Sequence, residues 1–524
     1  MTRCTISVCC LLFLLTLLLG ASTALAQNAD EPLRLILNAD APGPTINRHI
    51  YGHFAEHLGR DIYGGFWVKD DDGAWQLNQP VIEALRRINP PNVRWPGGCF
   101  ADYYHWRDGI GPRDERPTIV NTLWGGVTED NSFGTHEYMQ LVEALGTEPF
   151  VVGNVGSGTV EEMATWWEYM NHPGKSPMAD LRRANGQDEP WGVRFWGVGN
   201  ESWGCGGNMT PAYYSDVYKR FATFLHGYGD VRPFRIATGP DATSNNDLPE
   251  WTEGVMREAG RMIDGLDLHY YTVVGGWGGR TLATEFAEAE WIAAFEQARR
   301  VDDHIRSTSA IMDRYDPQKR VWLIVGEWGM WHLPEPGSER GFLYQQNALR
   351  DALVASISLD IFNQHADRVR MANIAQTINV LQAMILTERD GDGFVLTPTY
   401  HVFEMYKVHQ DAELLPLTLE AGEYTYVDKT IPALSASAST KDGRVHLSLT
   451  NMDPNQSHTV QASLRGGSFS SVSGRILTAE TMTAHNTFEQ PDAVAPTSFH
   501  GARLKGEQLT IMLPPKSMVV LELE

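Results

Sequence analysis

Between residues 50 and 376 the chain repeats one pattern, in which a short apolar run is followed by a longer amphipathic stretch. Such runs are typical of strands buried on both faces of a parallel sheet, and the stretches between them are typical of helices. Eight units in about 350 residues predict an α/β fold of the (β/α)8 TIM-barrel type. The eight runs lie at residues 50–57, 92–98, 149–155, 193–201, 235–240, 266–272, 321–328 and 369–376.

A doubly wound parallel sheet is the structural alternative. It lacks support, because no GxGxxG motif follows the first run and no Walker loop is present. Helices are expected between the runs, for example over residues 81–88, 134–145 and 211–225.

After about residue 412 the helical period fades and apolar residues alternate with polar ones, as at Val445, Leu447 and Leu449. This pattern predicts a C-terminal all-β sandwich domain. A similar alternation at Leu33, Leu35 and Leu37 predicts an N-terminal strand that joins the sandwich. The expected organisation is a signal peptide over 1–26, the N-terminal strand segment over 27–49, the catalytic barrel over 50–411 and the sandwich over 412–524.

The first residues resemble an export signal. Arg3 precedes an apolar run over residues 11–19, and Ala24-Leu25-Ala26 provides a small-x-small cleavage site. The sequence therefore predicts an exported protein, periplasmic or extracellular, with no membrane association after cleavage. The formal net charge of -23 argues against nucleic acid or an anionic membrane as a partner.

Two cysteines, Cys99 and Cys205, remain once the predicted signal peptide is removed. They could form one bridge, but each lies in a glycine-rich motif, and we favour free, local roles for them. No cysteine pair has zinc-site spacing, and His53 and His57 lack an HExxH arrangement. No metal and no cofactor are predicted.

In a parallel barrel, functional side chains come from the C-terminal ends of the strands. Glu201 and Glu327 each end a strongly apolar run, on the fourth and seventh of the eight. A single glutamate at such a place is more often a salt-bridge partner or a helix cap. Two carboxylic acids that face one pocket are the minimum that glycoside hydrolysis requires, since one donates a proton and the other attacks the sugar or activates water.

Neighbouring residues support a sugar site. Trp124, Trp328 and Trp331 could stack on a sugar ring, although any one of them is equally well explained as a core residue. His269 and Tyr271 share one face of their strand, because strand side chains alternate with period two, and both could point at the same acid.

Five segments, in this order and spacing, resemble the motifs of the α-L-arabinofuranosidases of glycoside hydrolase family 51. They are IYGHFAEHLGRDIYGGFWV, RWPGGCFADYYHWRDGIGPRDERP, WGVGNESWGCGGNM, LHYYT and GEWGMW. The resemblance implies that Glu201 is the general acid/base and Glu327 the nucleophile of a retaining enzyme. The two carboxyl groups should then lie about 5–5.5 Å apart, whereas about 9 Å would indicate inversion.

The resemblance also assigns roles to the surrounding residues. His269 and Tyr271 would orient the nucleophile, while Trp124 and Trp331 would border the sugar. The furanose hydroxyls would be bound by Glu56, Arg94, Gly98, Cys99, Asn200 and Gln376.

Two positions depart from the family pattern, which usually has Asp before the nucleophile and often has Asn two residues after it. Gly326 and Gly329 occupy these places. Loss of a carboxylate beside Glu327 should alter the electric field there, which affects rate and specificity rather than the type of reaction.

The predicted function is that of a retaining, exo-acting α-L-arabinofuranosidase, which releases terminal arabinofuranose from arabinan, arabinoxylan or derived oligosaccharides. The resemblance further implies a homo-oligomer, often a hexamer. One alternative is a glycosidase of the same scaffold with other specificity, a β-xylosidase or an endoglucanase. A second is a non-catalytic carbohydrate-binding protein, which would not need both acids.

Overall fold

A computed structural model describes residues 32–244, 248–389, 391 and 393–524. Its central feature is a closed barrel of eight parallel strands, and each of the eight predicted runs coincides with one of them. The (β/α)8 prediction is therefore confirmed. In the order in which they pair around the barrel, the strands are β2 (Gly52–Phe54), β5 (Asn92–Trp95), β8 (Glu148–Gly153), β9 (Phe195–Val198), β10 (Phe234–Asp241), β11 (Gly265–Thr272), β12 (Trp322–Met330) and β13 (Val369–Ile374).

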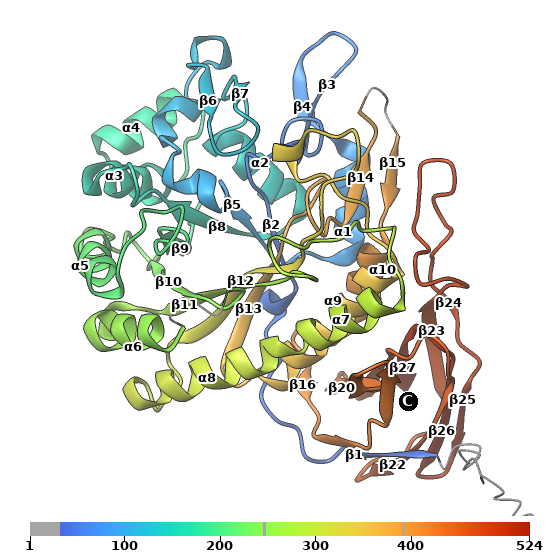
Figure 1. Cartoon of the computed structure of the whole chain (residues 1–524). Helices are drawn as coiled ribbons and strands as arrows, with labels where there is room; N and C mark the ends of the chain where they lie inside the picture. Colours follow the sequence, from blue (N-terminus) through green and yellow to red (C-terminus); the bar gives the residue numbers. More distant parts are fainter. Residues whose placement is uncertain (1–31, 245–247, 390, 392) are drawn as a thin grey trace, which may run out of the picture.

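Helices surround the barrel on its outer side (Figure 1). α1 illustrates why they form: Pro80 lies in its first turn, its buried residues include Val81, Leu85 and Ile88 along one face, and Asn89 ends it in the left-handed conformation. The others are α2 (Thr135–Leu145), α3 (Val160–Asn171), α4 (Pro177–Ala184), α5 (Pro211–Ala222), α6 (Leu248–Ala259), α7 (Glu288–Ala298), α8 (Arg300–Tyr315), α9 (Leu349–Gln364) and α10 (Pro398–Tyr406), with α1 covering Gln79–Ile88.

The C-terminal part forms two antiparallel-rich sheets, as predicted for an all-β domain (lower right in Figure 1). Leu509, Ile511 and Leu513 are buried while Met512 between them is exposed, which explains the alternation in the sequence. One sheet has the order β17 (Leu417–Leu419), β1 (Leu33–Asn38), β22 (His458–Arg465), β26 (Gln508–Leu513), β25 (Ala502–Lys505). The other has the order β16 (Glu413–Leu414), β20 (Leu434–Lys441), β21 (Arg444–Asn451), β27 (Ser517–Leu523), β23 (Val472–Thr478), β24 (Thr497–Ser498).

The N-terminal strand β1 lies inside the first of these sheets, antiparallel to β17 and parallel to β22. Helix α9 connects the two parts of the molecule, because it packs against β12 of the barrel and against β20 and β21 of the sandwich. Its residues 349–363 are all buried, on every side of the helix, which is why it lacks a polar face. Among the described residues, no helix combines the length and the apolar character needed to cross a membrane.

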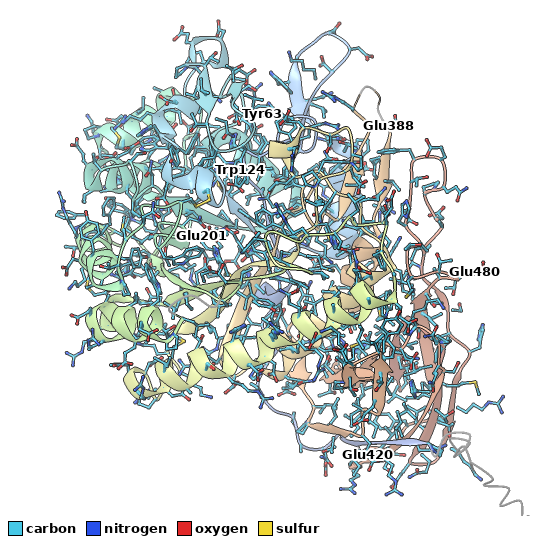
Figure 2. The ribbon with its side chains drawn as sticks, in the orientation of Figure 1. Tyr63, Trp124, Glu201, Glu388, Glu420 and Glu480 are labelled. Carbon is cyan, nitrogen blue, oxygen red and sulfur yellow. A yellow bond between two sulfur atoms is a disulfide. The ribbon has the colours of Figure 1, made fainter. Side chains whose placement is uncertain are left out.

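Three β-hairpins, which the sequence patterns did not predict, extend from the loops that follow the barrel strands, at the top of Figure 1. They are β3–β4 (Trp67–Lys69 and Trp75–Leu77), β6–β7 (Ile119–Asn121 and Val127–Glu129) and β14–β15 (Ile385–Thr387 and Phe394–Leu396). They border a cavity of about 1190 Å³, and no predicted site residue lines it. In the view of Figure 2, Trp124 lies between Tyr63, which lines this cavity, and Glu201.

Candidate active site

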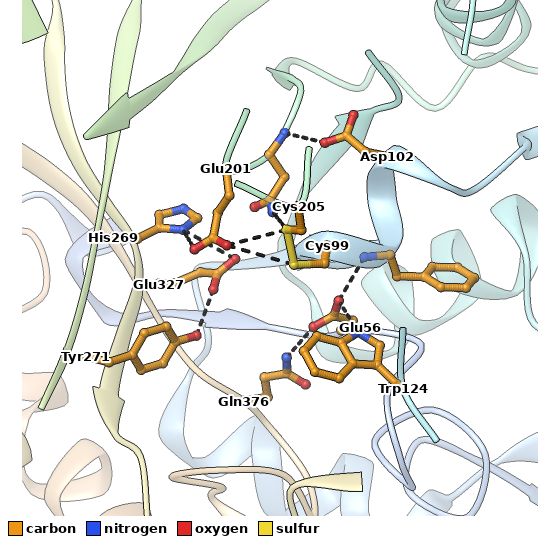
Figure 3. The surroundings of a disulfide bond; sticks show 12 residues. Glu56, Cys99, Asp102, Trp124, Glu201, Cys205, His269, Tyr271, Glu327 and Gln376 are labelled. Carbon is orange, nitrogen blue, oxygen red and sulfur yellow. Dashed lines mark hydrogen bonds and ion pairs between the residues drawn. A yellow bond between two sulfur atoms is a disulfide. The ribbon is translucent and has the colours of Figure 1, made fainter. Parts of the chain in front are cut away.

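The predicted site residues converge at the C-terminal ends of the barrel strands (Figure 3). Glu327 on β12 is almost fully buried. Its Oε1 accepts a hydrogen bond from Arg94 Nη1 at 2.8 Å, and its Oε2 accepts one from the Tyr271 hydroxyl at 2.7 Å. Arg94 also donates to Asn200 Oδ1 at 2.5 Å. The hydrogen bonds from Arg94 and from the Tyr271 hydroxyl fix the orientation of the Glu327 carboxyl group.

Glu201 follows β9 in a backbone conformation with φ of 39°, which residues other than glycine rarely adopt. Its Oε1 lies 2.9 Å from Nδ1 of His269. Burial and the negative charge of Glu327 raise the pKa of Glu201, while the hydrogen bond from His269 opposes that shift. A carboxylate oxygen of Glu201 and one of Glu327 lie within 4.8 Å of each other, so the two groups face one another across a short gap.

His269 lies between the two acids. Its Nδ1 is 3.6 Å from Glu327 Oε1 as well as 2.9 Å from Glu201 Oε1, and its Nε2 is 3.3 Å from Asp267 Oδ2. Burial by itself would lower the pKa of His269, but the charges of Glu327 and Asp267 raise it to about 10. At neutral pH the ring is therefore an imidazolium, and both nitrogens donate hydrogen bonds.

The two cysteines form a disulfide, with Cα atoms 5.5 Å apart, so the prediction of free thiols is wrong. Cys99 follows β5 and Cys205 follows β9, and the two loops meet over β8, which separates those strands in the barrel. The sulfur atoms of Cys205 and Cys99 lie 3.5 and 3.9 Å from Glu201 Oε2. A disulfide sulfur carries no hydrogen, so these are apolar contacts that help to desolvate the acid.

A third carboxyl group, that of the buried Glu56, lies near Glu201 and Glu327. Its oxygens accept hydrogen bonds from Trp124 Nε1 at 2.9 Å, from Gln376 Nε2 at 2.6 Å and from the backbone amide of Phe100 at 3.1 Å. Burial and the charge of Glu327 raise the pKa of Glu56 to about 7. These bonds hold Glu56, Trp124 and Gln376 in fixed positions, as a polar binding wall requires.

Two glycines of the predicted motifs shape the site, whereas only one of two nearby tryptophans lies at it. A Cβ on Gly98 would lie 2.7 Å from Glu327 Oε1, so glycine leaves room beside this carboxyl group. Gly329 has φ of 138°, a conformation that side chains with a Cβ rarely adopt. Trp331 meets the Tyr271 ring edge-on at 4.9 Å, at the site. Trp328 instead packs on Phe362 and Phe403 behind the barrel wall, so it is a core residue.

The chemistry of the donors does not fit a metal ion. Among the described residues, two groups of three side chains bring candidate donor atoms close together, and both belong to this site. One includes the sulfurs of the disulfide, which are not thiolates, and the other includes the protonated His269. The groups are Cys99, Glu201 and Cys205, and Glu201, His269 and Glu327.

Sequence reasoning missed Asp102, which ends a 3-10 helix over Cys99–Asp102. Its oxygens accept hydrogen bonds from the backbone amides of Asn200, Val155 and Gly156 at 2.9, 2.7 and 2.8 Å. Asp102 thereby ties the loops after β8 and β9 to that of β5, and it holds the backbone next to Glu201. Its only sequence signal is its place within the motif RWPGGCFADYYHW.

The variant Asp102→Asn places an amide NH2 against one of these backbone donors. We expect its free energy of unfolding to fall by about 2 kcal/mol, since a buried charge-assisted hydrogen bond is lost and a donor is left unpaired. Denaturant unfolding measures this. Asp216→Asn, whose exposed side chain pairs with Lys219 one helical turn away, is the control, and an unchanged midpoint for Asp102→Asn would contradict the structural role.

Two facing carboxyl groups at the C-terminal face of a (β/α)8 barrel, one with a raised pKa and one bound by a buried arginine, define a glycoside hydrolase. The sequence matches two family models, the "Alpha-L-arabinofuranosidase 1 domain" over residues 84–281 and the "Alpha-L-arabinofuranosidase C-terminal domain" over residues 326–517. The chain belongs to the α-L-arabinofuranosidases of glycoside hydrolase family 51.

Individual relatives agree with this assignment. An "Intracellular exo-alpha-L-arabinofuranosidase" of Bacteroides ovatus is 48% identical over 97% of this chain and 98% of its own length. The family 51 arabinofuranosidase from Xanthomonas axonopodis pv. citri has a sequence identity of 51% to this chain. Its crystal structure matches with a TM-score of 0.92, over 94% of this chain and 100% of that one. The arabinose complex of the Thermotoga maritima α-L-arabinofuranosidase is 29% identical, with a TM-score of 0.80, over 94% and 99% of the two chains.

The predicted export is contradicted by the Bacteroides relative, which is named an intracellular enzyme and matches nearly the whole of this chain. The prediction of a periplasmic or extracellular location is therefore wrong. The apolar run and the small-x-small site on which it relied lie within residues 1–26, outside the described residues.

Proposed function

We propose that the protein is a retaining, exo-acting α-L-arabinofuranosidase that releases terminal arabinofuranose by double displacement from arabinan, arabinoxylan or derived oligosaccharides. Glu327 is the nucleophile and Glu201 the general acid/base. The observation that carries the proposal is the short gap between the two carboxylates, whose oxygens come within 4.8 Å of each other. Inverting enzymes need about 6.5–9.5 Å between the two groups to admit a water, so the gap supports retention.

In the first step Glu327 forms a bond to C1 of the arabinofuranose while the bond from C1 to the leaving oxygen breaks. That oxygen takes the proton of Glu201, which burial and the charge of Glu327 keep on the acid. Arg94 and Tyr271 hold the attacking carboxylate in place.

The second step uses the same groups in the opposite direction. Once Glu327 is esterified it carries no charge, so one of the causes that raise the pKa of Glu201 is removed. Glu201, which has already given its proton to the leaving oxygen, therefore stays ionised. It accepts a proton from the water that attacks C1, the bond from C1 to Glu327 breaks, and arabinose leaves with its original anomeric configuration.

The remaining residues form the sugar site. Arg94, Asn200, Glu56 and Gln376 offer fixed donors and acceptors to the furanose hydroxyls, with Gly98 leaving room for the ring. Apolar contact comes from Cys99 in its disulfide, and from Trp124 and Trp331 at the border of the site.

The test is the initial rate on an aryl α-L-arabinofuranoside compared with an aryl β-D-xylopyranoside. We expect rapid release from the arabinoside and little from the xyloside, and NMR of the first product should show the α anomer. Rapid hydrolysis of the xyloside alone would favour a β-xylosidase. Binding of arabino-oligosaccharide without turnover would favour a carbohydrate-binding protein.

Substrate choice and assembly need separate measurements. Arabinan, arabinoxylan and short arabino-oligosaccharides should each yield arabinose as the sole small product if the enzyme acts from chain ends. The homo-oligomer implied by the family resemblance stays a prediction, which sedimentation velocity of the full chain tests directly.

A further inference from the structure

We propose that Asp267 is a positioning residue for catalysis: from β11 it holds His269 against both catalytic acids, in space that Gly326 leaves open on β12. The inference rests on the proposed roles of Glu201 and Glu327. It concerns how the carboxylate of Asp267 on β11 and the glycine that precedes Glu327 on β12 fit together.

The first observation is the place of Asp267. It lies two residues before His269 and four before Tyr271, so the three side chains share one face of β11. Its Oδ2 is 3.3 Å from His269 Nε2. Its Oδ1 is buried and, among the described residues, has no hydrogen-bond partner. A buried carboxylate whose side-chain contact is a histidine nitrogen serves to orient and charge that histidine.

The second observation is the shape of β12. The pairing of β11 with β12 runs from Leu268 with Val325 directly to His269 with Glu327, so Gly326 is the extra residue of a β-bulge. A Cβ on Gly326 would lie 1.9 Å from Asp267 Oδ1. Gly326 does not have a positive φ, so glycine is needed here for space and not for conformation.

These two observations describe an exchange between neighbouring strands. Position 326 of β12 carries no side chain, and the carboxylate of Asp267 from β11 occupies the space that a side chain there would need. The bulge also directs the Glu327 side chain toward the site, since bulges re-aim the residues beside them.

The charges around His269 explain why the carboxylate matters. Glu201 approaches its ring from the end of β9, Glu327 from β12 and Asp267 from β11 itself, while Arg94 of β5 binds Glu327. Asp241 pairs with His269 across β10 and β11, and its side chain accepts from the amides of Thr243 and Ser244. A neutral ring could donate to only one side, so the contact with Glu201 or the contact with Asp267 would be lost.

The first experiment is Asp267→Asn in the full chain. Loss of the carboxylate should lower kcat on an aryl α-L-arabinofuranoside by about 10- to 100-fold, as for other residues that orient a functional histidine. The alkaline limb of the kcat/KM profile, which reports protonated Glu201, should move to higher pH, because a His269 that Asp267 no longer orients and charges lowers the pKa of Glu201 less. Asp264→Asn, on the same stretch of chain but at the opposite end of the barrel, should change neither quantity.

The second experiment moves the carboxylate from β11 to β12. Gly326→Asp alone should be inactive or unstable, because its Cβ collides with Asp267. Asp267→Gly should lose activity as Asp267→Asn does. The double variant Asp267→Gly/Gly326→Asp should be at least about 10-fold more active than Asp267→Gly, since a carboxylate again reaches His269.

The outcomes separate this inference from the proposed function. A wild-type kcat and pH profile for Asp267→Asn would overturn the role of Asp267, and so would a folded double variant no more active than Asp267→Gly. Thermal unfolding identifies a variant that has not folded, in which case the pH profile of Asp267→Asn decides. An inactive wild type would overturn the proposed function itself.

Discussion

Glu327→Ala is expected to lower kcat on an aryl α-L-arabinofuranoside by about four orders of magnitude or more, the scale seen when a nucleophile acting within a catalytic unit is removed. No other carboxylate among the described residues is placed to attack from the same position, since Asp267 contacts His269 and Glu56 is held by Trp124 and Gln376. Steady-state kinetics of the purified variant measures the loss.

Two further measurements separate chemistry from folding. Removal of Glu327 leaves the buried Arg94 without its charge partner, which lowers stability as well as activity. Glu327→Gln keeps an acceptor for Arg94 and should be equally slow but closer to wild type in unfolding. Azide added to Glu327→Ala should give the β-arabinofuranosyl azide, with inverted configuration, because it enters from the vacated side. Unchanged turnover in either variant would rule out Glu327 as the nucleophile.

The barrel and its two acids could be predicted because both leave a local mark on the sequence. A strand covered on both faces is almost entirely apolar, so a charged residue at its end, as in VRFWGVGNE and VWLIVGEW, stands out. Counting the strands then places Glu201 and Glu327 on the fourth and seventh, β9 and β12.

Other features depend on contacts between distant segments. The disulfide joins residues 106 apart whose loops meet only once β5, β8 and β9 are assembled. Trp328 follows Glu327 directly, yet the pleat turns it toward α9 and α10 rather than toward the two acids. The alternation of side chains along a strand places Asp267 on the same face as His269 and Tyr271, so its position could have been predicted. Its role could not, because that role depends on the β-bulge at Gly326, which no sequence pattern marks.

Glu201→Ala is expected to affect the two steps, and different substrates, unequally. A nitrophenolate leaves without a proton, so the first step on a nitrophenyl arabinoside should persist while hydrolysis of the arabinosyl-enzyme slows. The result should be a burst followed by a turnover about 10²- to 10⁴-fold below wild type, with a lowered KM. Arabino-oligosaccharides should lose more, because a sugar alkoxide cannot leave unprotonated. Stopped-flow and steady-state rates measure both.

Glu201→Ala also tests the pH dependence of kcat/KM and the side of the sugar on which Glu201 lies. In the wild type the first step needs protonated Glu201, so kcat/KM should fall as the pH rises through the raised pKa of this acid. Glu201→Ala should lose that alkaline limb on the nitrophenyl substrate. Azide added to this variant should accelerate turnover and give the α-arabinofuranosyl azide. It needs no general base, so it can attack the arabinosyl-enzyme in place of the water that Glu201 would have activated. The β-azide from this variant would mean that the two acids have been assigned in the wrong order.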